Sequence, residues 1–233
     1  MTAVSQFPDF SYERQRLAAY PAATLIGIDE AGRGPWAGPV VAGAAWISPD
    51  MVSHLPAGLT DSKKLCASRR QTIYAALLEL AKDRSKLRLA TAAIDARVID
   101  QTGILPATFR AMQTASNKLF DQDDGVWGHD GVIMLVDGSI QPNLSSPAQR
   151  TEVEAIIKGD LKLLSIAAAS IMAKVERDQI MIELAKAYPQ YGWQNNKGYG
   201  TAEHQAALAE HGCTAYHRLS FRPLAPYRNS GEA

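Results

Sequence analysis

Short apolar runs and longer stretches with apolar residues at helical spacing follow one another along the 233-residue chain. The short runs predict five strands, over 24–29, 39–47, 87–94, 131–136 and 152–158. Spacings of three and four residues between apolar positions predict three long helices, over 68–84, 105–120 and 161–187. Shorter helices are predicted over 12–19 and 201–210. Strands and helices that alternate in this way indicate an α/β domain built on a mixed sheet.

Local signals refine this outline. The first two strands are close enough along the chain to form a hairpin, and Ser68 with Gln71 matches a capping box at the start of the first long helix. Thr201 is suited to cap the last helix. Polar, glycine-containing segments at 121–130 and 188–199 predict loops.

The domain boundaries follow from the same pattern. Residues 1–22 are polar with scattered aromatics and indicate an N-terminal appendage. Residues 23–233 are long enough to form one catalytic domain with a single core. From about residue 188 the sequence pattern predicts a C-terminal helical extension of this domain. Apart from the ends, the composition is that of a globular protein, with 46% hydrophobic and 21% charged residues.

Composition also limits location and partners. No apolar run reaches the roughly eighteen residues of a membrane helix, and the N-terminus lacks the order of a secretory signal, so we expect a cytoplasmic protein without a membrane partner. Cys66 and Cys213 are too isolated for a disulfide framework or a zinc site. The formal net charge of zero argues against a protein that coats nucleic acid by bulk charge. Local basic clusters at 61–70 and 193–228 leave local contacts possible, although such clusters are more often solvated surfaces.

Carboxylates stand at the boundaries of three predicted core elements. Asp29 and Glu30 end the first strand before a glycine-rich turn, Asp137 ends the fourth strand, and Asp160 precedes the long helix. Each has an ordinary explanation: a solvated turn for the first pair, an Asp-Gly turn for Asp137 and a helix N-cap for Asp160. Because neighbours on a strand face opposite ways, Asp29 and Glu30 can serve one ion only if they converge, so we expect the strand to end or bulge there.

The recurrence of these acids favours a metal site over three separate coincidences. Carboxylate oxygens suit Mg²⁺ or Mn²⁺, which bind through few protein ligands and through phosphate oxygens of a substrate. The arrangement is typical of phosphodiester hydrolysis.

Six motifs, in order along the chain, resemble those of bacterial type 2 ribonuclease H (ribonuclease HII). They cover nearly everything from Leu25 to Pro223, and they read I-G-I-D-E-A-G-R-G-P-W-A-G-P-V-V from Ile26, D-S-K-K-L from Asp61, V-D-G from Val136, I-K-G-D with S-I-A-A-A-S-I-M-A-K-V-E-R-D from Ile157, Y-P-Q-Y-G-W with N-K-G-Y-G-T-A-E-H from Tyr188, and H-R-L-S-F-R-P from His217. Gly103-Ile104-Leu105 departs from the usual Asn-Ile-Leu, and the 121–130 loop is longer than typical. The resemblance implies a ribonuclease-H-like sheet flanked by helices.

The resemblance also implies roles for individual residues. The four metal-binding carboxylates would be Asp29, Glu30, Asp137 and Asp160, holding two Mn²⁺ or Mg²⁺ ions when substrate is bound. The expected reaction is hydrolysis of the RNA strand of an RNA/DNA hybrid, or a cut on the 5′ side of a single ribonucleotide in duplex DNA. The products would carry a 3′-hydroxyl and a 5′-phosphate, and the biological role would be removal of ribonucleotides from DNA.

Substrate recognition is expected from a second set of residues. The turn Gly32-Arg33-Gly34 would supply backbone groups near the 2′-hydroxyl, which distinguishes RNA from DNA, and Tyr199 would stack on the following deoxyribose. Lys63, Lys64 and Lys174 would contact phosphates. Asp178 is a secondary candidate, because a structural salt bridge explains it equally well. His204, His211 and His217 are more simply read as structural histidines.

Two other functions compete with this one. A DNA-directed nuclease of the same fold would use similar acids, but the Gly-Arg-Gly turn and Tyr199 argue against it. A catalytically silent nucleic-acid-binding module would not need all four acids. Nothing in the sequence demands a dimer, and we expect a monomer.

Overall fold

The fold centres on a five-stranded mixed sheet. The computed structural model describes residues 7–122, 131–148 and 150–227. The strands are β1 Thr24–Ala31, β2 Val40–Ile47, β3 Leu87–Ile94, β4 Val132–Asp137 and β5 Thr151–Ile156. They lie in the order β3-β2-β1-β4-β5, with β2 antiparallel to both of its neighbours, β1 and β3, and with β1, β4 and β5 parallel. The predicted hairpin of the first two strands and the mixed sheet are therefore confirmed.

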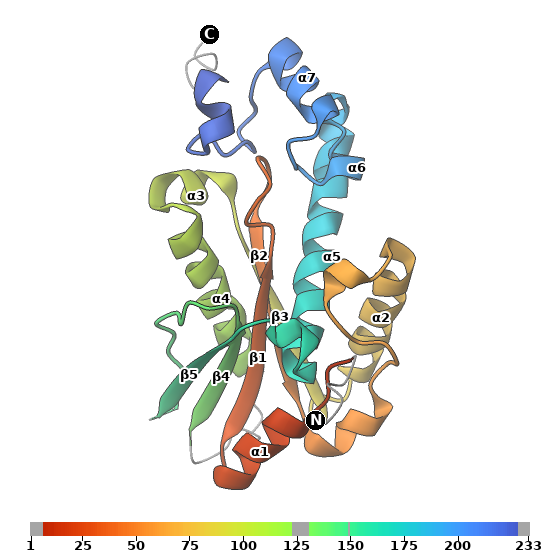
Figure 1. The fold of residues 1–233 in the computed structure, drawn as a ribbon, viewed down its shortest axis with the longest axis vertical. Coiled ribbons are helices and arrows are strands. Elements are labelled where there is room, and N and C mark those ends of the chain that lie inside the picture. The colour runs from red at the N-terminus through yellow and green to blue at the C-terminus, as the bar shows by residue number, and fades with distance from the viewer. Residues whose placement is uncertain (1–6, 123–130, 149, 228–233) are drawn as a thin grey trace, which may run out of the picture.

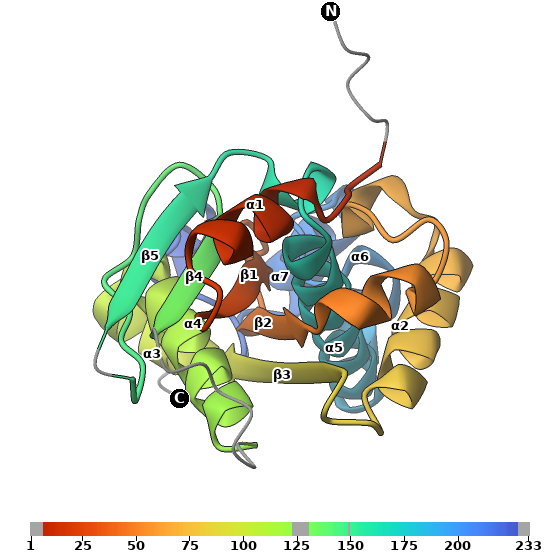
Figure 2. The same ribbon diagram turned by 90° about the horizontal axis from the view of Figure 1, so that it is seen from below.

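Helices cover both faces of this sheet (Figures 1 and 2). They are α1 Ser11–Ala19, α2 Ala67–Leu80, α3 Ala96–Thr102, α4 Ile104–Phe120, α5 Leu164–Ala187, α6 Trp193–Asn196 and α7 Ala202–His211. Helix α4 packs on one face through Ala111, Met112 and Ala115, and α5 packs on the other through Ala167, Ala168 and Ile171. Helices α6 and α7 continue beyond the sheet at the far end of α5, in blue at the top of Figure 1.

The contact between α5 and the sheet is unusually close because both surfaces are made of small residues. A Cβ atom on Gly27 would lie 2.3 Å from the backbone carbon of Ser165, and one on Gly43 would lie 2.2 Å from the carbonyl oxygen of Ala169. The alanines at 167–169 are fully buried against these glycines. The backbone of α5 therefore rests directly on β1 and β2, which fixes the helix relative to the strand that carries Asp29.

The predicted elements are confirmed, with corrections to their ends and caps and one added helix. Helix α2 begins at Ala67 and has Cys66 as its N-cap without a side-chain hydrogen bond, so Ser68 lies inside the helix and the predicted capping box is wrong. The same helix ends at Leu80, because residues 82–86 turn by hydrogen bonds three residues apart and Asp83 accepts from Ser85. Helix α3 was not predicted; Asp95 caps it by accepting a hydrogen bond from the Val98 amide.

The region around the long helix needs further corrections. Asp160 does not cap α5: it lies in a separate 3₁₀ turn, Gly159–Leu161, and Leu163 is the N-cap. The predicted loop 188–199 contains the short helix α6, and Thr201 caps α7 as predicted, by accepting from the His204 amide. Most of the predicted 121–130 loop lies outside the described residues.

The N-terminal helix α1 is attached to the domain by polar contacts. Glu13 is fully buried and accepts hydrogen bonds from the amide and hydroxyl of Ser165, at the start of α5. Arg16 forms ion pairs with Glu152 and Glu154 of β5. Residues 11–19 therefore bridge β5 and the beginning of α5. Across the described ranges, no helix has the length and apolar character needed to cross a membrane.

Candidate active site

Three carboxylates from separate elements meet at one edge of the sheet. Asp29 comes from β1, Asp137 from the end of β4 and Asp160 from the 3₁₀ turn after β5. Each contributes a carboxylate oxygen to a group whose atoms all lie within 4.8 Å of one another. Asp29 and Asp160 are buried, with 2% and 6% of their surface exposed. Three carboxylates this close, with so little water around them, form a site suited to a hard divalent cation.

Backbone geometry explains why these side chains converge. The parallel pairing of β1 with β4 brings Asp29 and Asp137 to the face that α5 covers. The turn that carries Asp160 is tied to this edge, because the Gly159 amide donates a 2.7 Å hydrogen bond to Oδ1 of Asp137. A Cβ on Gly159 would lie 2.5 Å from Cδ1 of Ile166, so a larger residue there would have to displace the end of this side chain.

Glu30 lies apart from this group of three. The prediction that β1 ends or bulges at Asp29 is wrong, because its pairing with β2 continues without interruption to Ala31 and Val41. Glu30 therefore points to the opposite face of the sheet from Asp29. Its Oε1 accepts a 3.3 Å hydrogen bond from Nη1 of Arg33. Glu30 is one residue from the metal-suited group but outside the 4.8 Å cluster.

Burial and mutual repulsion act together on the acids. Burial, followed by the charges of Glu30 and Asp137, raises the pKa of Asp29 well above its ordinary value. Burial, followed by the charges of Asp137 and Asp61, raises the pKa of Asp160 to about 6. Burial also raises the pKa of Glu30, although Arg33 opposes it. The site therefore carries more negative charge than its own protein surroundings stabilise, which is the condition under which a cation binds strongly.

Lys63 is a cation that interacts electrostatically with all three clustered acids. Burial alone would lower the pKa of its ammonium group, but Asp29, Asp61 and Asp160 outweigh burial and the net shift is upward. Lys63 follows Asp61, whose Oδ1 accepts a hydrogen bond from the Lys63 amide in the 3₁₀ turn Ser62–Lys64. One lysine neutralises only part of the negative charge of the three acids, and a metal ion could neutralise the remainder.

We expect Asp29→Asn to stabilise the metal-free protein. A carboxyl group whose pKa is raised on folding costs stability once the pH exceeds the unfolded value of about 4, and asparagine removes that cost. In EDTA at pH 8 the free energy of unfolding should rise by roughly 1–2 kcal/mol, and the difference should disappear below pH 4. Thermal unfolding across this pH range measures it. A variant less stable than wild type at pH 8 would show that protein partners already satisfy the Asp29 charge.

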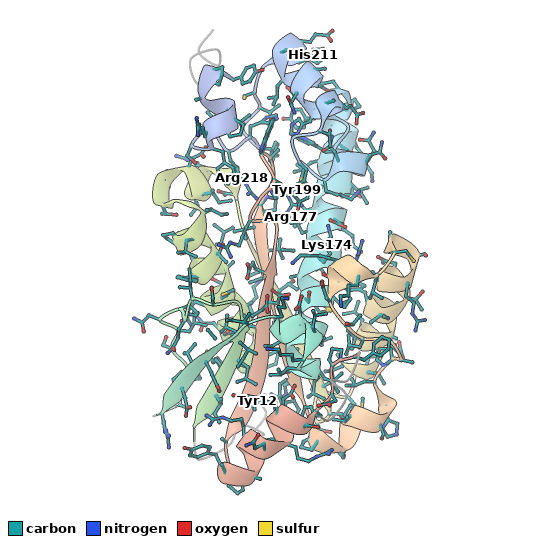
Figure 3. All side chains as sticks on the ribbon, viewed as in Figure 1. Tyr12, Lys174, Arg177, Tyr199, His211 and Arg218 are labelled. Atoms are coloured by element: carbon teal, nitrogen blue, oxygen red, sulfur yellow. The ribbon has the colours of Figure 1, made fainter. Side chains whose placement is uncertain are left out.

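A groove of about 780 Å³ opens beside the carboxylates. Most of the predicted substrate-binding residues line it, namely Gly32, Arg33, Gly34, Lys63, Lys174 and Tyr199, together with Glu30, Ser62, Arg70 and Arg177. Lys64 is exposed but does not line this groove. Lys174, Arg177, Tyr199 and Arg218 follow one another along the upper part of the β1–β2 hairpin in Figure 3. The structure thus brings all the predicted sugar-reading residues, and all the predicted phosphate-binding residues except Lys64, into one groove.

Asp178 forms ion pairs with two residues that line this groove, Lys174 and Arg70. Its Oδ1 accepts a 2.6 Å hydrogen bond from the Lys174 ammonium, and its Oδ2 lies 3.8 Å from Nη2 of Arg70. Asp178 is not a member of the group of three carboxylates. These contacts agree with the structural explanation of Asp178 and place two cations at the groove wall.

Two of the three candidate histidines, His204 and His217, are buried behind Tyr199. His204 Nδ1 lies 3.0 Å from the Tyr199 carbonyl oxygen, and its Nε2 lies 3.0 Å from Nε2 of His217. His217 Nδ1 accepts a 2.8 Å hydrogen bond from the Thr214 amide. These partners require a proton on Nδ1 of His204 and on Nε2 of His217, so both rings are neutral. Burial, followed by the neighbouring His204, lowers the pKa of His217 to about 4.

This pair predicts a loss of stability in mild acid. Because the folded pKa of His217 lies near 4 and the unfolded value near 6.5, its contribution is complete above pH 6.5 and is lost as the pH falls toward 4. Between pH 7.5 and 4.5, the free energy of unfolding should fall by about 1–3 kcal/mol more in wild type than in His217→Asn. Thermal unfolding of both, with the exposed His54→Asn as control, measures the difference. Parallel pH profiles for wild type and His217→Asn would contradict the neutral-pair assignment.

Sequence reasoning missed two buried arginines. The Arg218 guanidinium donates to the carbonyl oxygens of Gly32 and Arg33 in the Gly-Arg-Gly turn, and the Arg177 guanidinium donates to those of Ala37 and Pro39, just after the turn. A Cβ on Gly32, where φ is +97°, would lie 2.0 Å from Nε of Arg177. The signal was present, because an arginine within the apolar stripe of a long helix needs buried acceptors.

Comparison with known proteins identifies the family of the chain. The family model for ribonuclease HII matches residues 26–223. Ribonuclease HII of Jannaschia sp. is 43% identical over 94% of this chain and 96% of its own length, and that of Rhodospirillum rubrum is 46% identical over 93% and 90%.

Solved structures show the same fold. The ribonuclease H2 of Pyrococcus horikoshii superposes with a TM-score of 0.69 and 24% identity, covering 89% of this chain and 98% of that one. Bst-RNase HIII, solved in complex with Mn²⁺, has a TM-score of 0.69 and 20% identity, covering 90% and 71%. The predicted ribonuclease-H-like fold is thus confirmed. With a family model that spans most of the sequence and relatives above 40% identity over nearly the full length, this chain belongs to the ribonuclease HII family of metal-dependent endoribonucleases.

Proposed function

We propose that the protein hydrolyses the RNA strand of RNA/DNA hybrids and cuts on the 5′ side of single ribonucleotides within duplex DNA. The observation that carries this proposal is the position of the three clustered carboxylates beside a groove with a Gly-Arg-Gly wall. Glu30, next to Asp29 in the chain, lines this groove, so a surface for a sugar-phosphate chain adjoins the metal-suited site. Removal of ribonucleotides from DNA in the cytoplasm is the corresponding cellular role.

Asp29, Asp137 and Asp160 would hold Mn²⁺ or Mg²⁺, and Glu30 would complete the set when substrate brings a second ion to the sheet edge. The donor set fits such ions, because it consists of carboxylate oxygens that are buried and mutually repulsive. When bound, divalent ions supply an activated water and stabilise the departing 3′ oxygen, which leaves a 3′-hydroxyl and a 5′-phosphate. The crystal structure of Bst-RNase HIII with Mn²⁺ shows that a protein of this fold binds such an ion.

Cations along the groove would hold the duplex by its phosphates. Lys63, Lys174 and Arg70 line the groove, and Lys64 lies on the exposed turn beside it. The net charge of the chain is zero, so attraction of the duplex depends on this local cluster. Such contacts position a duplex without reading its sequence.

Recognition of the ribonucleotide would come from the opposite wall. Tyr199 has 47% of its surface exposed, and a Cβ on Gly34 would lie 3.7 Å from its Cε1 atom. The tyrosine ring and the Gly-Arg-Gly backbone are therefore neighbours. The backbone would contact the 2′-hydroxyl while the ring stacks on the next deoxyribose, so that the RNA-to-DNA junction is read as a unit. The catalytic unit of residues 23–233 would act as a monomer, with its C-terminal extension from about 188 supplying Tyr199.

Cleavage mapping tests the proposal. A labelled DNA duplex with one ribonucleotide, an RNA/DNA hybrid and an all-DNA duplex are each incubated with the protein and Mn²⁺ or Mg²⁺. We expect a cut on the 5′ side of the ribonucleotide, cutting of the hybrid, no cut in all-DNA and no reaction in EDTA.

Other outcomes separate the alternatives. Cutting of the hybrid but not of the single ribonucleotide would remove the junction-reading role of Tyr199. Cutting of all-DNA would favour a DNA-directed nuclease. No hydrolysis at any metal concentration, with retained duplex binding, would favour a silent binding module.

A further inference from the structure

Two buried guanidinium groups hold the backbone around the Gly-Arg-Gly turn: Arg218 binds the turn itself, and Arg177 binds the residues that follow it. Arg218 donates from Nη2 to the Gly32 carbonyl at 2.7 Å, from Nη1 to the Arg33 carbonyl at 3.1 Å and from Nε to the Gly38 carbonyl at 2.9 Å. Arg177 donates at 3.0–3.1 Å to the carbonyls of Pro39, Ala37 and Lys197. Both side chains are fully buried, with at most 1% exposed. The turn lacks strand pairing over 32–36, so these hydrogen bonds replace it.

The contacts of Arg218 determine which way the turn presents its amides. All peptide bonds of the described residues are trans, so a carbonyl and the following N–H point in opposite directions. Because the carbonyls of Gly32 and Arg33 point at Arg218, the N–H groups of Arg33 and Gly34 point away from it. Among the described residues, none accepts a hydrogen bond from either N–H. Gly32, Arg33 and Gly34 line the groove, and these two donors are directed there.

Arg218 is itself held by a rigid part of the C-terminal segment. The carboxylate of Asp100 on α3 accepts hydrogen bonds from the amides of Leu219 and Ser220 at 2.9 and 2.8 Å. His217 pairs with Ala37 in a backbone bridge and with His204, whose ring contacts the Tyr199 carbonyl. The Gly-Arg-Gly turn and Tyr199 are therefore attached to one rigid unit.

We propose that Arg218 is a positioning residue for ribose discrimination: by fixing the peptide planes at 32–34, it aims the Arg33 and Gly34 amides at the ribonucleotide. This inference rests on the proposed function, since it assumes that the turn reads the 2′-hydroxyl. The planar guanidinium matches three carbonyls in fixed directions, and a lysine ammonium, which is a point charge, does not. Arg218 acts through the turn and does not touch substrate.

Arg218→Lys tests this role against a matched control. Arg88 is also fully buried, and its guanidinium also donates to two backbone carbonyls, those of Arg84 and Gln122, at the start of β3. In an Asp137→Asn background, affinity is measured for a duplex with one ribonucleotide and for the all-DNA duplex. We expect Arg218→Lys to lower the ratio of these affinities on the order of tenfold. Affinity for all-DNA and Mn²⁺ binding at the remaining carboxylates should not change, and Arg88→Lys should leave the ratio unchanged.

The outcomes distinguish the inference from the function on which it rests. An unchanged ratio in Arg218→Lys, with a normal ratio in the parent, overturns the positioning role alone. An equal fall in Arg88→Lys also overturns it, since general loosening would then explain the effect. A parent that binds both duplexes equally refutes the ribose-reading turn itself. If Arg218→Lys unfolds below the assay temperature, Arg177→Lys takes its place, because it loosens Ala37 and Pro39 on either side of Gly38, the third carbonyl that Arg218 holds. It is then expected to lower the ratio, and an unchanged ratio there overturns the inference.

Discussion

Asp137→Asn should reduce turnover on the order of a thousandfold or more and leave duplex affinity within about twofold of wild type. Asp137 offers an oxygen to the group of three carboxylates and, through the same side chain, holds the Gly159 amide at 2.7 Å. Asparagine keeps an oxygen for that amide but removes one negative charge from the metal-suited cluster. Single-turnover cleavage of a ribonucleotide-containing duplex, with fluorescence anisotropy for binding, measures both quantities.

Glu30→Gln is the informative companion to this variant. Glu30 lies on the other face of β1 and outside the cluster, so its loss should reduce turnover less than the loss of Asp137 if the cluster holds the principal ion. Full activity in Asp137→Asn would remove Asp137 from the site. Equal losses in both variants would mean that the two faces of β1 act on one metal set.

Gly43→Ala should lower the free energy of unfolding by about 3 kcal/mol, a large effect for a single methyl group. The added Cβ would lie 2.2 Å from the Ala169 carbonyl oxygen, and the obstacle is backbone rather than a side chain that can rotate away. Helix α5 would have to lift from β2, which would also disturb the position of Asp29 relative to Asp160. Urea unfolding at neutral pH measures the loss.

Gly34→Ala is the control for this stability prediction. Gly34 is a glycine with room for a Cβ, which would meet only the Tyr199 ring at 3.7 Å. We expect little change in stability from Gly34→Ala, within about 0.5 kcal/mol. If both variants unfold at the same urea concentration as wild type, the contact between α5 and the sheet is not the tight one described here.

Periodicity was sufficient to predict most elements of the fold. The predicted strand 87–94 coincides with β3, and the helix predicted over 105–120 begins one residue earlier in the structure. Errors fall where local hydrogen bonds compete with each other. Ser68 has the chemistry of a cap, but the chain is already helical at Ala67, and Asp160 has the chemistry of an N-cap, but a 3₁₀ turn separates it from α5.

The candidate site was predictable in membership but not in geometry. Asp29, Asp137 and Asp160 could be identified because they stand at element boundaries, where burying an unpaired carboxylate beside the core destabilises the fold. That Glu30 faces away from them depends on whether β1 stays regular, and pairing with β2 decides this. Arg177 and Arg218 could not be connected to the turn at 32–39, because their acceptors are backbone carbonyls, which every residue possesses.

The parallel pairing of β1 with β4 has a consequence for the time at which this protein becomes a nuclease. Thr24 of β1 pairs with Val132 of β4, so a long intervening chain must be synthesised before β1 can pair with β4. Asp160 and the helix that rests on β1 come later still. Non-local pairing of this kind forms slowly and cooperatively. A chain emerging from the ribosome therefore carries its first acids for most of its synthesis without a competent centre, and cleavage begins only after folding is complete.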